Sequence, residues 1–270
     1  MISSTLAIYG GIYALTGSVA GLIAGTLGIG GGIVIIPALL FIFQHNSAFP
    51  PHLIMHMAVG TSLAVMFFTA QASVRAHHQL NGILWDVFKR LLPGLASGIV
   101  CGALTASYLS TDLLKILFAI FLIVVGIRLL LAKPSVHTPS SCLGKPLINT
   151  VISFLIGFTS GLLGVGGGSL VIPYLNYCGV EMRKAVAISA LVTVIVALLG
   201  TFIFIIMGLK ENSLPLYSTG YIYWPAVFCL ALLSSVFAPL GAKITYRISV
   251  RQLQYAFVLL LFIVAMELLF

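Results

Sequence analysis

The sequence predicts an all-α polytopic membrane protein built from two inverted repeats of about five helical segments each. This prediction depends on the composition, on a duplicated glycine-rich stretch and on the distribution of basic residues. Hydrophobic residues make up 60% of the 270-residue chain and charged residues only 7%, whereas a soluble domain carries about 25% charged residues. The first Asp, Glu, Lys or Arg is Arg75. Apolar runs of this length span a bilayer as helices.

Charged residues and Pro/Gly clusters divide the chain into ten apolar segments, five on each side of a polar linker at 133–146. Because this linker is short and rich in Pro and Ser, it joins two halves of one transmembrane domain that covers 1–270. The first repeat occupies 1–132 and the second 147–270. The predicted segments lie at 5–25, 31–43, 53–74, 91–109, 113–132, 147–163, 167–178, 185–207, 222–242 and 252–270.

Two nearly identical glycine-rich stretches, Gly25–Pro37 and Gly161–Pro173, occupy corresponding positions in the two halves. Each has four glycines in five residues, followed by an apolar turn and a proline. Glycine is the costliest ordinary residue to hold in a helix, so each cluster predicts a break in a membrane helix or a close backbone approach. Further matches between the halves, such as Ala58–Ser62 with Ala185–Ser189, indicate an ancient duplication.

The basic residues predict the orientation of the repeats. Alternating sides through five segments per half places eleven of the 13 Lys and Arg residues on one face, with only Lys115 and Lys210 on the other. Because cytoplasmic loops collect Lys and Arg, we expect cytoplasmic basic loops, both termini outside and repeats of opposite orientation in the cell membrane. Segments 31–43 and 167–178 would rise only about 20 and 18 Å against a core of about 30 Å. We favour a re-entrant hairpin in each half. Two full crossings by the first two segments would leave the later segments on the same sides of the membrane, so this alternative stays open.

The chemistry at such breaks favours an anion. Each glycine cluster stands directly before a short helix, so unpaired N–H groups and the positive end of a helix dipole face the break. Glycine lets an anion approach these groups without obstruction. The alternative is that glycines only pack helices, which is the expected role of Gly17, Gly21, Gly25, Gly157 and Gly161. The predicted binding glycines are Gly28, Gly30, Gly31, Gly32, Gly164, Gly166, Gly167 and Gly168.

Hydroxyl groups near the breaks are candidate substrate contacts. Thr61, Ser62 and Ser189 open the third segment of their halves, and Ser169 follows the second glycine cluster. Ser and Thr in membrane helices also hydrogen-bond their own backbone, so this alternative stays open. Among the histidines before the third segment, His56 lies nearest the membrane. A solvated loop histidine is the expected state of His56, with proton coupling as the alternative.

No residue pattern predicts a cofactor, a metal site or an enzyme. The four cysteines are scattered singly without a CxxC pair, which favours free thiols over a zinc site or a disulfide framework. HExxH and GxSG motifs and a pair of membrane aspartates are also missing from the sequence. The net charge of +8 is confined to short loops, so we expect no nucleic-acid partner.

The paired Gly-xx-Gly-Ile/Val-Gly-Gly-Gly-xxx-Ile-Pro stretches, with Ala-Val-xx-Ser after each, resemble the sulfite exporter TauE/SafE family, also called the toluene sulfonate uptake permease family. The resemblance covers essentially the whole chain. It implies transport of sulfite or of organic sulfur anions such as sulfoacetate. The two halves differ at Thr26 and Ile33, where the second half has Leu162 and Ser169, so the half-sites cannot contribute identical polar groups.

The sequence therefore predicts a secondary transporter that moves a small sulfur-containing anion, of sulfite or organosulfonate type, across the cell membrane by alternating access. The broken helices in repeats of opposite orientation are typical of such transporters. The alternatives are a channel or uniporter for the same anions and, third, a membrane enzyme or assembly factor. The expected partners are the anion and the lipid bilayer, and a homo-oligomer stays open.

Overall fold

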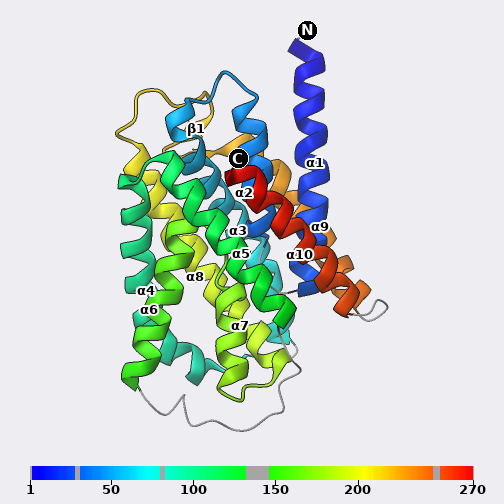
Figure 1. Cartoon of the computed structure of the whole chain (residues 1–270), viewed down its shortest axis with the longest axis vertical. Coiled ribbons are helices and arrows are strands. Elements are labelled where there is room, and N and C mark those ends of the chain that lie inside the picture. The colour runs from blue at the N-terminus through cyan, green and yellow to red at the C-terminus, as the bar shows by residue number, and fades with distance from the viewer. Residues whose placement is uncertain (1, 28–30, 80–82, 132–145, 246–249, 270) are drawn as a thin grey trace.

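The computed structural model describes residues 2–27, 31–79, 83–131, 146–245 and 250–269. In this part of the chain it forms ten α-helices, a short 3₁₀ helix and one two-stranded hairpin (Figure 1). The first half contains α1 (Ile2–Leu27), α2 (Gly32–Gln44), the 3₁₀ helix Pro51–Leu53, α3 (Ile54–Gln79), α4 (Trp85–Tyr108) and α5 (Thr111–Leu131). The second contains α6 (Pro146–Leu163), α7 (Gly168–Tyr177), α8 (Met182–Gly208), β1 (Ser218–Thr219), β2 (Ile222–Tyr223), α9 (Trp224–Thr245) and α10 (Val250–Leu269).

Each predicted segment overlaps one of the ten helices, which confirms the all-α prediction. The largest boundary difference is at α4, which begins at Trp85 rather than 91. Its first two turns contain Asp86, Lys89 and Arg90, which end the apolar run without ending the helix. An acidic side chain in the first turn interacts favourably with the helix dipole, and this explains why Asp86 is tolerated there.

Five helices in the described residues are long and apolar enough to cross a membrane: Pro51–Arg75, Trp85–Tyr108, Thr111–Leu131, Pro146–Leu163 and Met182–Gly208. Large apolar side chains on the surface of the bundle, including Val124, Leu155, Phe202 and Phe228, are exposed. Such a surface fits contact with lipid acyl chains and not with water. The chain is therefore a polytopic membrane protein.

The two helices that follow the glycine clusters are short. The 13 residues of α2 and the 10 of α7 would rise about 20 and 15 Å, which is less than the hydrocarbon core. In Figure 1, α2 leads from its break towards the end of the bundle that carries β1, whereas α7 leads towards the end at which α6 begins. Neither helix crosses a bilayer by itself.

Helices of the two halves pair with one another. The main pairs are α1 with α9, α4 with α6, α3 with α8 and α5 with α10. Under the predicted repeat, α1 corresponds to α6 and α9 to α4, so the first two pairs are counterparts. The glycines at 94, 98 and 102 of α4 lie successively against Thr150, Phe154 and Phe158 of α6, so these two helices run parallel.

Close helix contact explains the small-residue pattern. A Cβ at Gly21 would fall 2.6 Å from the carbonyl oxygen of Ser234 in α9, and one at Gly157 would fall 2.3 Å from that of Leu95 in α4. A Cβ at Gly161 would fall 2.6 Å from the carbonyl oxygen of Ile99 in α4, and one at Gly17 would fall 3.1 Å from Leu233 in α9, which confirms the predicted packing role for the four residues. The predicted packing role of Gly25 stays a prediction, because the surroundings of this residue lie outside the described part of the structure.

The third helix of the first half lies at the centre of the bundle. In the candidate span that contains α3, 83% of the most apolar stretch is buried, compared with 33% to 44% in the other four. Contacts of α3 with α2 place the first glycine break beside it, and the closeness of Gly164 to Val59 places the second there.

The expectation of free thiols is wrong at one position, because Cys178 is disulfide-bonded.

Candidate functional site

The two glycine breaks meet in the core of the protein. Gly32 begins α2, and a Cβ added to it would fall 2.8 Å from the carbonyl oxygen of Gly164. Gly164 has φ of +66°, a conformation that favours glycine, and a Cβ there would be 2.7 Å from Val59 of α3. Backbone of both halves is therefore in contact at a point where side chains are excluded.

Buried glycines surround this contact. Of the eight predicted binding glycines, the structure describes Gly31, Gly32, Gly164, Gly166, Gly167 and Gly168, and all six are buried. The other two, Gly28 and Gly30, lie outside the described residues.

Helices α3 and α8 flank the breaks. From α3, the hydroxyl of Ser62 donates to the carbonyl oxygen of Gly164 at 3.3 Å. Met66, also in α3, borders both Gly32 and Gly166. From α8, a Cβ at Gly166 would meet Thr193 at 3.1 Å, and one at Gly167 would meet Val192 at 2.4 Å.

Both short helices begin with backbone N–H groups that lack an intrahelical acceptor. In α7, the N–H groups of Leu170 and Val171 donate to the carbonyl of Gly167 at 3.2 and 2.8 Å, which leaves the N–H groups of Gly168 and Ser169 outside the helical ladder. The start of α2 repeats this arrangement, because the carbonyl of Gly31 accepts hydrogen bonds from the N–H groups of Val34 and Ile35. The caps Gly31 and Gly167 have no side chain that could bond these groups. Each helix start is therefore a set of donors with a positive dipole end.

Two buried hydroxyls beside the second break have no hydrogen-bond partner in the described residues. Most Ser and Thr hydroxyls in these helices donate to a carbonyl one turn earlier, as Thr105 and Thr193 do. Ser169 and Ser189 do not, although they are only 7% and 0% exposed. Thr201 and Ser218 also lack partners, but they belong to the far end of α8 and to β1.

Ser189 is linked to the second break through Thr193, which lies one turn further along α8. The hydroxyl of Thr193 donates to the carbonyl of Ser189 at 2.9 Å, and its side chain borders Gly166. Sequence reasoning missed Thr193, although its i, i+4 spacing from Ser189 places the two residues on one helix face.

The first half uses its hydroxyls differently. Ser62, the counterpart of Ser189, is bonded to Gly164, and the hydroxyl of Thr61 accepts a bond from the N–H of Tyr223 at 3.1 Å. Ile33 stands where the second half has Ser169. The structure thus brings Ser62 to the breaks but gives it and Thr61 bonds within the protein, whereas the unpartnered hydroxyls belong to the second half.

His56 is not the solvated loop residue that the sequence predicted. It lies in the first turn of α3 and is 4% exposed. Its Nε2 is 3.1 Å from the carbonyl oxygens of both Ala106 and Leu109, at the C-terminal end of α4. The prediction was wrong because these two acceptors lie about fifty residues away in the sequence, where local patterns carry no information about them.

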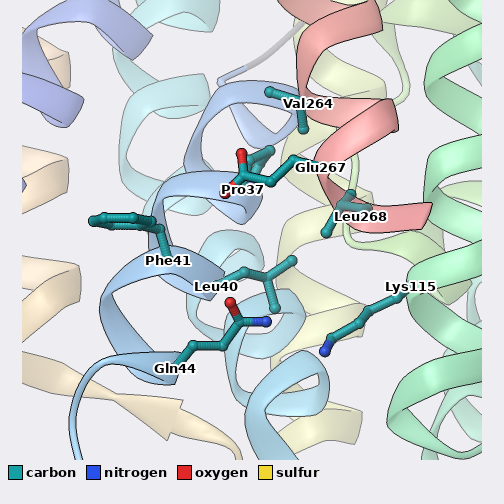
Figure 2. A pocket seen from close by; sticks show the side chains of 8 residues that line it. All are labelled: Pro37, Leu40, Phe41, Gln44, Lys115, Val264, Glu267 and Leu268. Atoms are coloured by element: carbon teal, nitrogen blue, oxygen red, sulfur yellow. The ribbon is translucent and has the colours of Figure 1, made fainter. Parts of the chain in front are cut away.

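A small pocket lies elsewhere, between α2, α5 and α10 (Figure 2). It encloses about 50 Å³, room for a few water molecules. Its polar groups are Gln44, Lys115 and Glu267, and Figure 2 shows the carboxylate of Glu267 near Pro37, apart from the amine of Lys115. None of the predicted binding residues lines this pocket, so the glycine breaks remain the candidate site. Among the described residues, no group of three His, Cys, Asp or Glu side chains could hold a metal ion.

Comparison with known proteins places the chain among membrane transporters. The model of the family described as sulfite exporter TauE/SafE matches residues 13–268. A probable membrane transporter protein of Haemophilus influenzae is 33% identical over 94% of this chain and 95% of its own length. Proteins of the same description from Methanocaldococcus jannaschii and Bacillus subtilis are 30% and 25% identical, over 89% and 96% of this chain and 88% and 97% of their own. No solved structure matches the chain.

Proposed function

Because the chain belongs to the sulfite exporter TauE/SafE family, we propose that this membrane transporter is a secondary carrier of a small sulfur-containing anion of sulfite or organosulfonate type. The observation that carries the proposal is the meeting of Gly32 with Gly164 beside the N–H groups at the two helix starts and two buried hydroxyls that have no partner among the described residues. Donors without acceptors in a buried place favour a ligand that brings only acceptors. The oxygens of a sulfite or sulfonate group are such acceptors.

The second half is the better candidate for direct contact with the anion. The start of α7 offers the N–H groups of Gly168 and Ser169, and the unpartnered hydroxyls of Ser169 and Ser189 lie in α7 and α8. In the first half, Ser62 instead fixes the backbone at Gly164. Binding would satisfy buried polar groups that otherwise cost free energy, which supports a site on this side of the contact.

Alternating access between inverted repeats is supported by the helix pairing. A two-fold axis between the halves would exchange α1 with α6 and α4 with α9, and the observed pairs α1 with α9 and α6 with α4 map onto each other. The same axis would make α3 and α8 antiparallel neighbours. They are, since Gly60 borders Phe204 and Gly200 borders Leu63. The substrate would then lie where the repeats meet.

The basic residues support one orientation of the protein in the cell membrane. The starts of α4 and α8, which carry Lys89, Arg90, Arg183 and Lys184, lie at the same end of the bundle in Figure 1. We place this end in the cytoplasm and both termini outside. Single cysteines at Asn212 and at Arg183, in a chain whose other cysteines are replaced, would test this placement. A membrane-impermeant thiol reagent applied to whole cells should label position 212 and spare 183, and the reverse labelling would refute the orientation.

Counterflow in proteoliposomes tests the function. Vesicles loaded with unlabelled sulfite or sulfoacetate should accumulate the same labelled anion transiently, because a carrier exchanges its substrate across the membrane. Gly167→Val should abolish the exchange, since even a Cβ at this position would fall 2.4 Å from Val192. Gly11→Val is the matched control, because nothing lies within 4 Å of a Cβ there. Conductive flux without counterflow would favour a channel, and no flux of either anion would refute the proposed function.

A further inference from the structure

His56 occupies a buried junction where α3 begins and α4 ends, which is the outer side in the orientation proposed above. Its ring lies against the C-terminal end of α4 and against Tyr221, whose ring centroid is 5.3 Å away. Tyr221 precedes β2 in the segment between α8 and α9. The imidazole thus touches two elements besides its own helix.

The hydrogen bonds fix which nitrogen carries the proton in the neutral ring. Nε2 faces the carbonyl oxygens of Ala106 and Leu109, both at 3.1 Å. Carbonyl oxygens only accept hydrogen bonds, so the proton is on Nε2 and the lone pair is on Nδ1. Nδ1 is buried and has no partner among the described residues. A neutral His56 therefore keeps a basic nitrogen unused inside the protein.

The surroundings of the ring combine opposing influences on its charge. Tyr221 donates from its hydroxyl to a carboxylate oxygen of Glu211 at 3.5 Å, and Glu211 and His52 are the titratable groups that act on the imidazole electrostatically. Burial is the largest of these influences and disfavours the imidazolium, as does His52, whereas the carbonyls of Leu109 and Ala106 and the carboxylate of Glu211 favour it. The ring is therefore neutral in the present packing, and a rearrangement that admits water to Nδ1 would favour the imidazolium.

The first turns of α3 connect this junction to the glycine breaks. Gly60 lies one turn after His56, and a Cβ there would be 2.8 Å from the carbonyl oxygen of Tyr221. Thr61 accepts from the N–H of Tyr223 in β2. The neighbouring residues Val59 and Ser62 contact Gly164. A shift of the hairpin against α3 would therefore change the contact between the two breaks.

We propose that His56 binds the proton that couples anion movement to the pH gradient, an inference that rests on the proposed transport function. A proton from water adds to the lone pair of Nδ1 and gives an imidazolium, and it leaves from the same nitrogen when the ring returns to its neutral form. The positive charge offsets part of the negative charge of the bound anion. Because Nδ1–H needs an acceptor that the present packing lacks, protonation changes the contact of α3 with Tyr221 and the hairpin.

His56→Gln separates coupling from transport. The amide of Gln can still donate to the carbonyls of Ala106 and Leu109, but it takes up no proton near neutral pH. Sulfoacetate is a suitable probe because its charge is constant between about pH 6 and 8, since carboxylates titrate well below this range. In proteoliposomes, an imposed pH gradient should change sulfoacetate uptake by the wild type several-fold. The variant should keep counterflow of sulfoacetate and lose the response to the gradient.

His45→Gln is the matched control, because His45 is an exposed histidine at the end of α2, and it should respond as the wild type does. A gradient response in His56→Gln equal to that of the wild type would overturn the proposal, as would a wild type that exchanges sulfoacetate but ignores the gradient. Absence of counterflow in the wild type would instead refute the proposed function for this anion.

Glu211→Gln gives a second test that does not depend on the stability of a His56 variant. Removing the carboxylate removes an interaction that favours the imidazolium. The external pH at which the gradient effect is half-maximal should therefore move to lower values, with counterflow retained. An unchanged midpoint would contradict the assignment of the proton to His56.

Discussion

Gly32 lies directly against the backbone carbonyl of Gly164, so the two glycine clusters, one from each half of the chain, contact each other in the core. This contact explains why glycine is needed in both stretches. A side chain at Gly32 would displace the backbone of Gly164 or the side chain of Met66. At Gly164 the positive φ itself favours glycine. The breaks are thus one structural unit assembled from two distant parts of the sequence.

Gly32→Ala should separate the two breaks. The new Cβ would fall 2.8 Å from the oxygen of Gly164 and 3.0 Å from the sulfur of Met66. Overpacking of this kind costs about 1–3 kcal/mol, so we expect a lower melting temperature in detergent and a loss of counterflow. Gly11→Ala provides the control, because its Cβ would meet open space. Equal melting temperatures and exchange rates for both variants would argue against the contact.

The two repeat-related serines should differ in their effect on stability. Ser62→Ala removes the donor to the buried carbonyl of Gly164 and should cost about 1 kcal/mol. Ser189→Ala removes a buried hydroxyl that has no partner among the described residues, so the free energy of unfolding of this variant should stay unchanged or rise. Thermal unfolding in the absence of added anion measures both. A larger loss in Ser189→Ala than in Ser62→Ala would show that Ser189 has a structural role.

Ionisation of the Tyr221 phenol should make the protein less stable in strongly alkaline solution. Burial, with the nearby carboxylate of Glu211 second, raises the pKa of this phenol to about 12 from its usual value of 10.0. The folded protein therefore holds the proton more tightly than the unfolded chain. Its contribution is fully present below pH 10.0 and is lost as the pH rises towards about 12. Melting curves across this range should fall less steeply for Tyr221→Phe, and an identical fall would exclude this phenol as the cause.

The sequence was sufficient to predict the helical segments but not which helices pack against one another. The glycine clusters could be predicted as a pair because they are duplicated, and the ten segments because membrane helices are long and apolar. The small-residue spacing of Gly17 and Gly21 predicted helix packing without naming α9 as the partner.

The unpredicted parts of the site depend on tertiary contacts. The short hairpin at Ser218–Tyr223 is stabilised by Thr61 and by the end of α8, which are distant in the sequence. Likewise, Ser62 and Ser189 occupy equivalent repeat positions, but only Ser62 meets a carbonyl of the other half. Local pattern carries no information about these neighbours, so the asymmetry of the site emerged from the fold.

The affinity of the purified protein for sulfite and sulfoacetate, measured by calorimetry, tests most directly whether the anion binds at the second glycine break. Hydrogen bonds to charged groups contribute about 1.5–3 kcal/mol each, so Ser169→Ala and Ser189→Ala should each weaken binding about tenfold or more. Ser62→Ala should bind with nearly wild-type affinity once its lower stability is allowed for. Wild-type affinity in both Ser169→Ala and Ser189→Ala would contradict the account.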